Sequence, residues 1–282
     1  MSKKSKYASK DFTKESLPMN RKELFGDIFK LHHSKLFLCG AIIFLFAIPL
    51  ILIWFLKDYF YINQQNLNLD IRMFSLIFSI AEIPAFLILS IGFAGIARIL
   101  RSFSWMEPVF FKLDFSKSVK DNIKPTMISF LIAGVVNLVF DATYLFVNNG
   151  FIRAIPFGFN YFIIFPVLLQ SYFINSIYTN KYSLNLKLGI YYYFKTIIFT
   201  LLFCLIFYGI NIYANIHFVY LAGVILKYCI ITIVIILLLP VILQIASLYE
   251  MKVFDKNINA SRFPELINKG LYKPTEFKEF KK

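Results

Sequence analysis

The sequence is poor in charge and especially poor in acidic residues. Only 16% of its 282 residues are charged, whereas about a quarter are charged in a typical soluble domain. Apolar residues make up 59% of the chain, and 34 of them are phenylalanines. This composition excludes a soluble globular protein and predicts a chain that lies mostly in lipid.

Reactive side chains are scarce as well. The three cysteines, Cys39, Cys204 and Cys229, all fall in apolar stretches, which argues against both a disulfide framework and a metal site. No two of the three histidines have the spacing of a metal site on one helix. The sequence contains no Walker motif, dinucleotide fingerprint, nucleophile elbow, zinc-protease motif or paired Cys-x-x-Cys. We therefore expect no metal, no cofactor and no enzymatic activity.

What the sequence has in abundance is long apolar stretches, six of which are long enough to cross a bilayer as a helix of roughly 20 residues. They cover residues 36–56, 73–100, 125–147, 155–177, 193–214 and 218–249. The predicted fold class is therefore all-α, a polytopic bundle of six transmembrane helices with amphipathic cytoplasmic helices. Pro125 is well placed at the start of the third helix, and Pro49 is expected to kink the first.

The segments that connect these stretches alternate in their basic content. When Arg98 and Lys195, at the inner ends of their stretches, are counted with the adjoining segments, one side holds 26 of the 30 basic residues and the other side holds 3. By the positive-inside rule, both termini lie in the cytoplasm, and we expect the chain in the plasma membrane. The predicted domains are a basic tail with an interfacial helix (1–35), the transmembrane domain (36–249) and a second basic tail (250–282).

A net charge of +14 raises the question of nucleic-acid binding. The basic residues lie mostly in short loops and two tails, where they set the topology and contact anionic lipid head groups. The expected partner is therefore the lipid bilayer, and we do not expect a nucleic acid.

Two of the cytoplasmic segments have the pattern of amphipathic helices. Between the second and third stretches, apolar residues recur every four positions and form one helical stripe. The stripe consists of Phe111, Phe115, Val119 and Ile123. Residues 183–192, before the fifth stretch, have a similar pattern, and aligning Phe115 with Tyr182 gives a weak internal repeat at an offset of 67 residues. Such helices either dock a partner protein or simply cover the inner surface of the bundle.

Three segments in and after the second stretch carry a resemblance to a known family. They are GFAGIAR at 92–98, EPVF at 107–110 and FSKSVKDNIK at 115–124. Together they resemble the YesL-like family of bacterial membrane proteins, in which a Gly-containing second span and an Arg-containing run precede a Phe-rich cytoplasmic segment. The chain departs from that family at Leu87–Ser90, in its tails and in its sixth stretch. The resemblance implies a multi-span plasma-membrane protein, often encoded near carbohydrate-uptake ABC transporters, and supplies no catalytic residues.

Three charged residues lie well away from the inner ends of the apolar stretches, at a depth where each costs several kcal/mol to insert without a partner. Glu82, Asp141 and Lys227 are predicted at similar depths, roughly 10 to 15 Å below the outer surface at 1.5 Å per residue. Asn137 lies one turn from Asp141 on the same helix face. One interpretation is a buried ion pair of Lys227 with Glu82 or Asp141 that fixes helix packing. The other is an outward-facing site in which the unpaired carboxylate binds a cation, a proton or a polar solute.

Three functions are compatible with these features. The first is an accessory component of a solute uptake system, whose cytoplasmic helices dock ABC transporter subunits. The family resemblance implies that the solute is a carbohydrate. The second is a secondary transporter that uses Glu82, Asp141 and Lys227. The third is an enzyme acting on lipid, for which the sequence offers no cluster of nucleophile and base. The chain lacks the loop expected of an ABC permease, so we do not expect it to be the permease itself.

Overall fold

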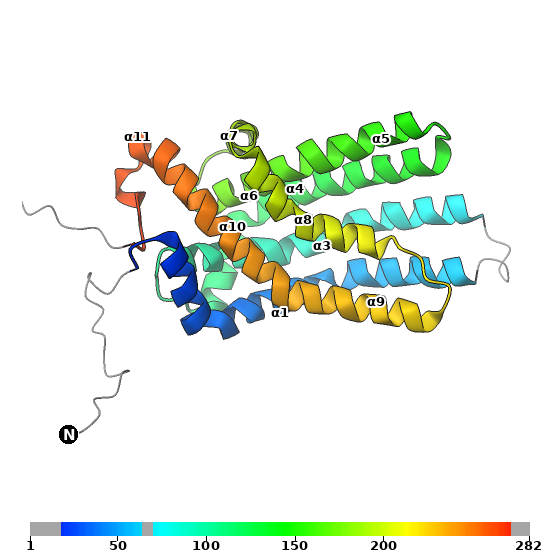
Figure 1. Ribbon diagram of the computed structural model, residues 1–282, viewed down its shortest axis with the longest axis horizontal. Helices are drawn as coiled ribbons and strands as arrows, with labels where there is room; N and C mark the ends of the chain where they lie inside the picture. Colours follow the sequence, from blue (N-terminus) through cyan, green and yellow to red (C-terminus); the bar gives the residue numbers. More distant parts are fainter. Residues whose placement is uncertain (1–17, 64–69, 272–282) are drawn as a thin grey trace, which may run out of the picture.

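The computed structural model describes residues 18–63 and 70–271, and the account below is confined to them. All regular secondary structure in these two ranges is helical. Six helical segments in them are long and apolar enough to cross a membrane, and they run along the long axis of the molecule (Figure 1). The predicted all-α bundle of six spans is confirmed, and the chain is a multi-pass membrane protein.

The first three spans are continuous helices, and the others are interrupted or flanked by shorter pieces. In chain order the first three are α1 (Arg21–Ile62), α3 (Ile71–Ser104) and α4 (Phe111–Phe146). The fourth span comprises α5 (Gly150–Phe159), the π-helical turn η2 (Asn160–Ile164) and α6 (Phe165–Ile177). The short helix α7 (Tyr182–Lys195) leads into the fifth span, α8 (Ile197–Ala214).

The sixth span comprises α9 (Leu221–Ile233), the π-helical turn η3 (Val234–Leu238) and α10 (Leu239–Phe254). It is followed by η4 (Asp255–Asn259), α11 (Ala260–Arg262) and η5 (Pro264–Leu266). Both ends of the described chain lie at the same end of the bundle (Figure 1), which we call the terminal end. The opposite end, where α1 stops and α9 begins, is called the distal end.

The helix predicted over the stripe exists, but the separate helix start expected at Pro125 is wrong, because α4 runs without a break from Phe111 through Pro125 into the third span. Its first part packs against α3. The hydroxyl of Ser118 donates to the carbonyl of Ala94 at 2.5 Å and accepts from the N–H of Arg98 at 3.0 Å. The stripe therefore belongs to the same helix as the third span and is held against α3 by this polar contact.

The N-terminal helix exists as predicted, although its apolar side packs against protein. The backbone of α1 is non-helical at His32 (φ −129°, ψ 15°), so a kink separates this helix from the span, while the backbone angles stay helical at Pro49. Leu24 and Ile28 are fully buried. Arg21 forms an ion pair with Asp255 at 2.9 Å.

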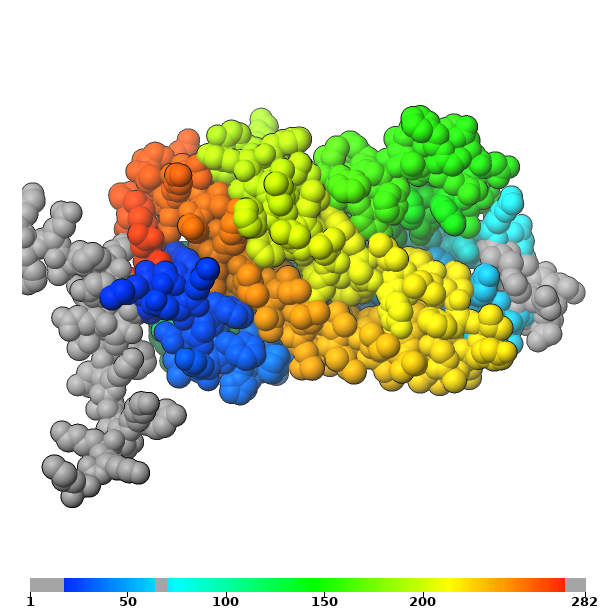
Figure 2. All heavy atoms as spheres, in the orientation of Figure 1, coloured from blue at the N-terminus to red at the C-terminus, as the bar shows by residue number. Residues whose placement is uncertain are grey.

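The C-terminal segment packs under the bundle beside that helix (Figure 2). Leu271 is buried, and Arg21 also donates to the carbonyls of Ser104 and Lys269. The predicted domain boundary after residue 249 falls inside α10, because the helix continues to Phe254. Residues 1–17 and 272–282 of the two predicted tails lie outside the described residues.

Two spans bend at the same combination of a π-helical turn and a proline. In the fourth span, the N–H of Phe165 bonds to the carbonyl of Asn160, and Pro166 has no N–H to donate. The carbonyls left free, those of Tyr161 and Phe162, accept hydrogen bonds from the hydroxyls of Tyr208 and Tyr193 respectively. Side chains from the fifth span and its leading helix thus stabilise an irregular backbone that would otherwise leave polar groups unpaired in lipid.

In the sixth span, Pro240 follows η3 at the same distance and cannot donate to the carbonyl of Ile236. That carbonyl lies directly against Gly40 of α1, where an added Cβ would overlap it. Only glycine permits this close approach of α1 to the bend.

We expect Gly40→Ala to destabilise the protein by about 1–3 kcal/mol, because the clash is with backbone and neither helix can yield alone. The matched control is Gly209→Ala in α8, where nothing lies within 4 Å of an added Cβ. That variant should be neutral or slightly stabilising. Thermal unfolding in detergent measures both, and equal effects of the two substitutions would contradict the close packing at Gly40.

Candidate functional site

A cavity of about 150 Å³ lies in the middle of the bundle and is lined by residues from all six spans. Its walls are mainly aromatic and aliphatic. Five phenylalanines face it: Phe86, Phe93, Phe130, Phe165 and Phe207. Both π-helical turns contribute to the lining, η2 through Asn160 and Tyr161 and η3 through Ile235. We call this space the central cavity.

A second cavity of about 400 Å³ lies beyond it, toward the distal end. Its lining is more polar and includes Lys57, Ser79, Asp141 and His217. Asp141 accepts a hydrogen bond from the hydroxyl of Ser79 at 2.6 Å. We call this space the vestibule.

The two cavities meet at a single layer of side chains. Consecutive turns of one helix line first the central cavity and then the vestibule, as with Asn137 and Asp141 in α4 or Asn211 and Asn215 in α8. Tyr161 lines both spaces. We define the polar ring as Trp54, Asn137, Tyr161 and Asn211, which line the central cavity at this level, together with Glu82, which lines neither cavity and lies behind Trp54 and Asn137.

Hydrogen bonds connect the members of the polar ring in two groups. The carboxylate of Glu82 accepts from the indole N–H of Trp54 at 3.1 Å and from the amide of Asn137 at 3.0 Å. The amide of Asn211 donates to the hydroxyl of Tyr161 at 2.7 Å. Glu82 is only 4% exposed, and no basic side chain pairs with it among the described residues. The ring therefore holds a buried carboxylate whose hydrogen-bond partners are neutral.

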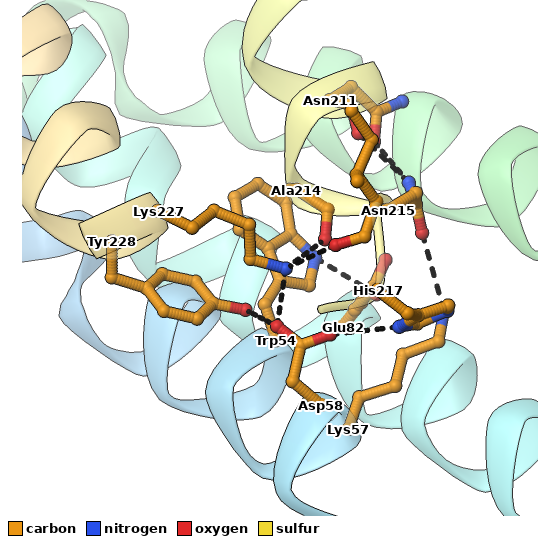
Figure 3. A network of polar contacts seen from close by, with 11 residues as sticks. Trp54, Lys57, Asp58, Glu82, Asn211, Ala214, Asn215, His217, Lys227 and Tyr228 are labelled. Atoms are coloured by element: carbon orange, nitrogen blue, oxygen red, sulfur yellow. Dashed lines mark hydrogen bonds and ion pairs between the residues drawn. The ribbon is translucent and has the colours of Figure 1, made fainter. Parts of the chain in front are cut away.

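Lys227 does not belong to this layer. It is fully buried and pairs with Asp58 of α1, while its ammonium also donates to the carbonyls of Ala214 and Ile216 at 2.9 and 3.0 Å (Figure 3). The predicted pairing of Lys227 with Glu82 or Asp141 is therefore wrong, although a buried ion pair exists. The reason is helix rotation, because the face of α9 that carries Lys227 is turned toward α1.

Asp58 was missed as a buried residue because the first span was expected to end at residue 56. In the structure α1 continues to Ile62, so Asp58 lies within the helix and is 1% exposed. It also accepts from the hydroxyl of Tyr228 at 2.8 Å and faces Nδ1 of His217 at 2.9 Å. A signal in the sequence was the apolar and aromatic run Tyr59–Ile62, which extends the helix beyond Asp58.

The stripe proposed for partner docking lies mostly against the chain itself. Phe111 and Phe115 pack on the hydrophobic core, and the ring of Phe115 occupies the space over Gly95 where a Cβ would lie. Val119 and Ile123 are half-buried. The arrangement fits the second interpretation of the stripe, a helix that covers the bundle.

A further buried carboxylate, Glu250, was assigned by sequence to the C-terminal tail. It is 1% exposed in α10 and accepts from the amide of Gln170 at 2.7 Å. The same amide reaches the hydroxyls of Thr200 and Thr196 at 2.8 and 3.1 Å. The unusual length of the sixth apolar stretch was the signal that this helix continues past residue 249.

No family model, curated protein or solved structure matches the chain. The resemblance to the YesL-like family therefore stays a prediction that rests on the three segments quoted above. Within the described ranges, no group of three or more His, Cys, Asp or Glu side chains is placed to hold a metal ion.

Proposed function

We propose that the chain is a secondary transporter of the plasma membrane that binds a small solute in the central cavity. The observation that carries this proposal is a cavity lined by all six spans that adjoins a vestibule at Tyr161, in the polar ring. With both termini in the cytoplasm, as the distribution of basic residues predicts, the vestibule opens to the outside. A solute would then pass the carboxylate of Asp141 and the side chains of Trp54 and Asn137, behind which Glu82 lies, on its way into the bundle.

The two bends support a protein that changes shape around this cavity. The π-helical turns η2 and η3 line it, and each is followed by a proline, Pro166 or Pro240. Irregular turns of this kind within a membrane helix are typical of binding sites and hinges. Discontinuous spans around a central binding site are also common among secondary transporters.

The accessory function receives less support from the structure. It depends on two docking helices: the first uses Phe111 and Phe115 inside the bundle, whereas the second, in α7, leaves Ile190 and Tyr191 exposed. A carbohydrate would also fit the central cavity poorly. A sugar needs many hydrogen-bonding partners, whereas the lining of this cavity is mainly aromatic and aliphatic. We therefore place the transporter first and do not propose a carbohydrate as its solute.

Ligand-dependent stabilisation tests the proposal. Purified protein is heated with a panel of sugars, amino acids, organic anions and organic cations, because a ligand at a hundred times its Kd stabilises by about 2.7 kcal/mol. Stabilisation by one class should disappear in Ala133→Phe, which fills the central cavity from α4. The matched control is Val139→Phe on the same helix, where the side chain is 52% exposed. Stabilisation that survives in Ala133→Phe would place binding elsewhere and refute the proposed site.

A further inference from the structure

The charges around the polar ring and the vestibule leave one buried carboxylate, that of Glu82, without an ion pair among the described residues. Asp141 and Lys57 line the vestibule together, and the guanidinium of Arg153 lies 5.1 Å from the centre of the Tyr144 ring in its wall. Asp58 and Lys227 neutralise each other. Glu82 is therefore the carboxylate at this level that could still attract a cation.

The carboxylate of Glu82 lies directly behind Trp54 and Asn137, which line the central cavity. The indole of Trp54 and the ring of Tyr161 stand at the polar ring, and phenylalanines form the walls of the cavity below it. Aromatic faces attract cations through the ring quadrupole, most strongly where water is excluded. A buried carboxylate and aromatic faces thus favour the same kind of ligand, a positively charged one.

The size and polarity of the central cavity narrow the class of ligand further. A cavity of about 150 Å³ with apolar walls holds one benzene-sized group. Its polar groups are confined to the ring side, because Asn137, Asn160 and Asn211 lie at or near that level. A ligand would place an apolar body in the central cavity and a polar head at the ring, beside Glu82.

We infer that the solute is a cationic amphiphile, an amine or quaternary ammonium joined to one ring or a branched alkyl group. This inference rests on the proposed function and specifies its substrate class. An anion of the same shape would be repelled by Glu82 and Asp141, and a neutral molecule would leave the carboxylate without a counter-charge.

Three probes of nearly the same shape and different charge test the inference. They are benzyltrimethylammonium, its uncharged isostere neopentylbenzene, and the anion benzylsulfonate. The chain has two tryptophans, so Trp105→Phe leaves Trp54 as the only one, and its fluorescence reports on the polar ring. Binding is measured by titration of this variant in detergent, alone and combined with Glu82→Gln, Ala133→Phe or Val139→Phe.

We expect benzyltrimethylammonium to bind best and Glu82→Gln to weaken it roughly thirtyfold. The same substitution should leave the affinity for neopentylbenzene unchanged, which shows that the cavity is intact. Ala133→Phe should abolish binding of both probes, and Val139→Phe should not.

Equal affinity for the cation and its isostere, or a cation affinity that Glu82→Gln leaves unchanged, would overturn the inference while the proposed function stands. Preferred binding of benzylsulfonate would also overturn it. If none of the three probes changes the fluorescence of Trp54, or if binding persists with Ala133→Phe, the proposed function fails together with the inference.

Discussion

Replacing Lys227 by methionine is expected to lower the free energy of unfolding by about 3 to 5 kcal/mol. The substitution leaves the carboxylate of Asp58 1% exposed and without its ammonium, with only Tyr228 and His217 to donate to it. It also frees the carbonyls of Ala214 and Ile216, which accept from Lys227 where the fifth span ends. Unfolding by heat or denaturant in detergent measures the loss.

A double-mutant cycle separates the ion pair from simple loss of packing. Asp58→Asn combined with Lys227→Met removes both charges and should recover most of the loss, because no uncompensated charge then remains buried. Lys57→Met, at the neighbouring position, is the matched control. Among the described residues the ammonium of Lys57 hydrogen-bonds only to the side-chain amide of Asn215, at 3.5 Å, so its loss should change the free energy of unfolding by no more than about 1 kcal/mol. A loss for Lys227→Met that is as small as that of Lys57→Met would show that the pair does not stabilise the fold.

The number and order of the spans were predictable because length and apolar content decide whether a helix crosses a membrane. Helix ends were less predictable, since they depend on tertiary contacts. The helix start expected at Pro125 lies inside α4, whose first part is held against α3 by the hydroxyl of Ser118. Likewise, Asp58 was expected outside the first span, and the partner that allows its burial is Lys227, 169 positions further along the chain.

The candidate site was predictable in part. Glu82 and Asn137 lie at one level and are hydrogen-bonded, as their positions in the spans suggested, whereas Asp141 lies one turn further toward the distal end. The rotation of each helix about its axis decides which side chains meet. A stretch that is apolar on both its lipid-facing and its protein-facing side carries little information about this rotation. For this reason the central cavity was not foreseen, nor was the role of Tyr161 between the two cavities.

The pattern of fixed and irregular contacts suggests where the bundle would move during transport. The sixth span is joined to α1 at the distal end by Lys227 and Asp58, and the segment that follows it is joined to the start of α1 by Asp255 and Arg21. Between these two attachments, η3 bends against Gly40 at the level of the central cavity. A hinge at η3 would open the cavity without breaking either ion pair, and η2 offers a second hinge on the opposite side of the fifth span.

Neutralising Asp141, which lines the proposed route, and Glu82, which lies directly behind it, is expected to reduce transport at least tenfold, because two charges that attract a cation are lost together. The variant combines Glu82→Gln with Asp141→Asn, and the assay is accumulation of labelled benzyltrimethylammonium in proteoliposomes with a negative interior. Stability should change little, since the amide oxygen introduced by Glu82→Gln would still accept from the indole of Trp54, and Asn137 can turn its amide to accept from the new side chain.

Asp70→Asn is the matched control for this double variant. Asp70 is also an acidic residue at the distal end, where its carboxylate caps α3 by accepting from the N–H of Arg72 at 2.9 Å. Asparagine caps a helix about as well, and Asp70 does not line the vestibule, so transport should remain at the wild-type rate. A general effect of negative charge at this end would lower transport in both variants. Loss confined to the double variant would assign the attraction to the two carboxylates, and undiminished transport in that variant would exclude them from the route.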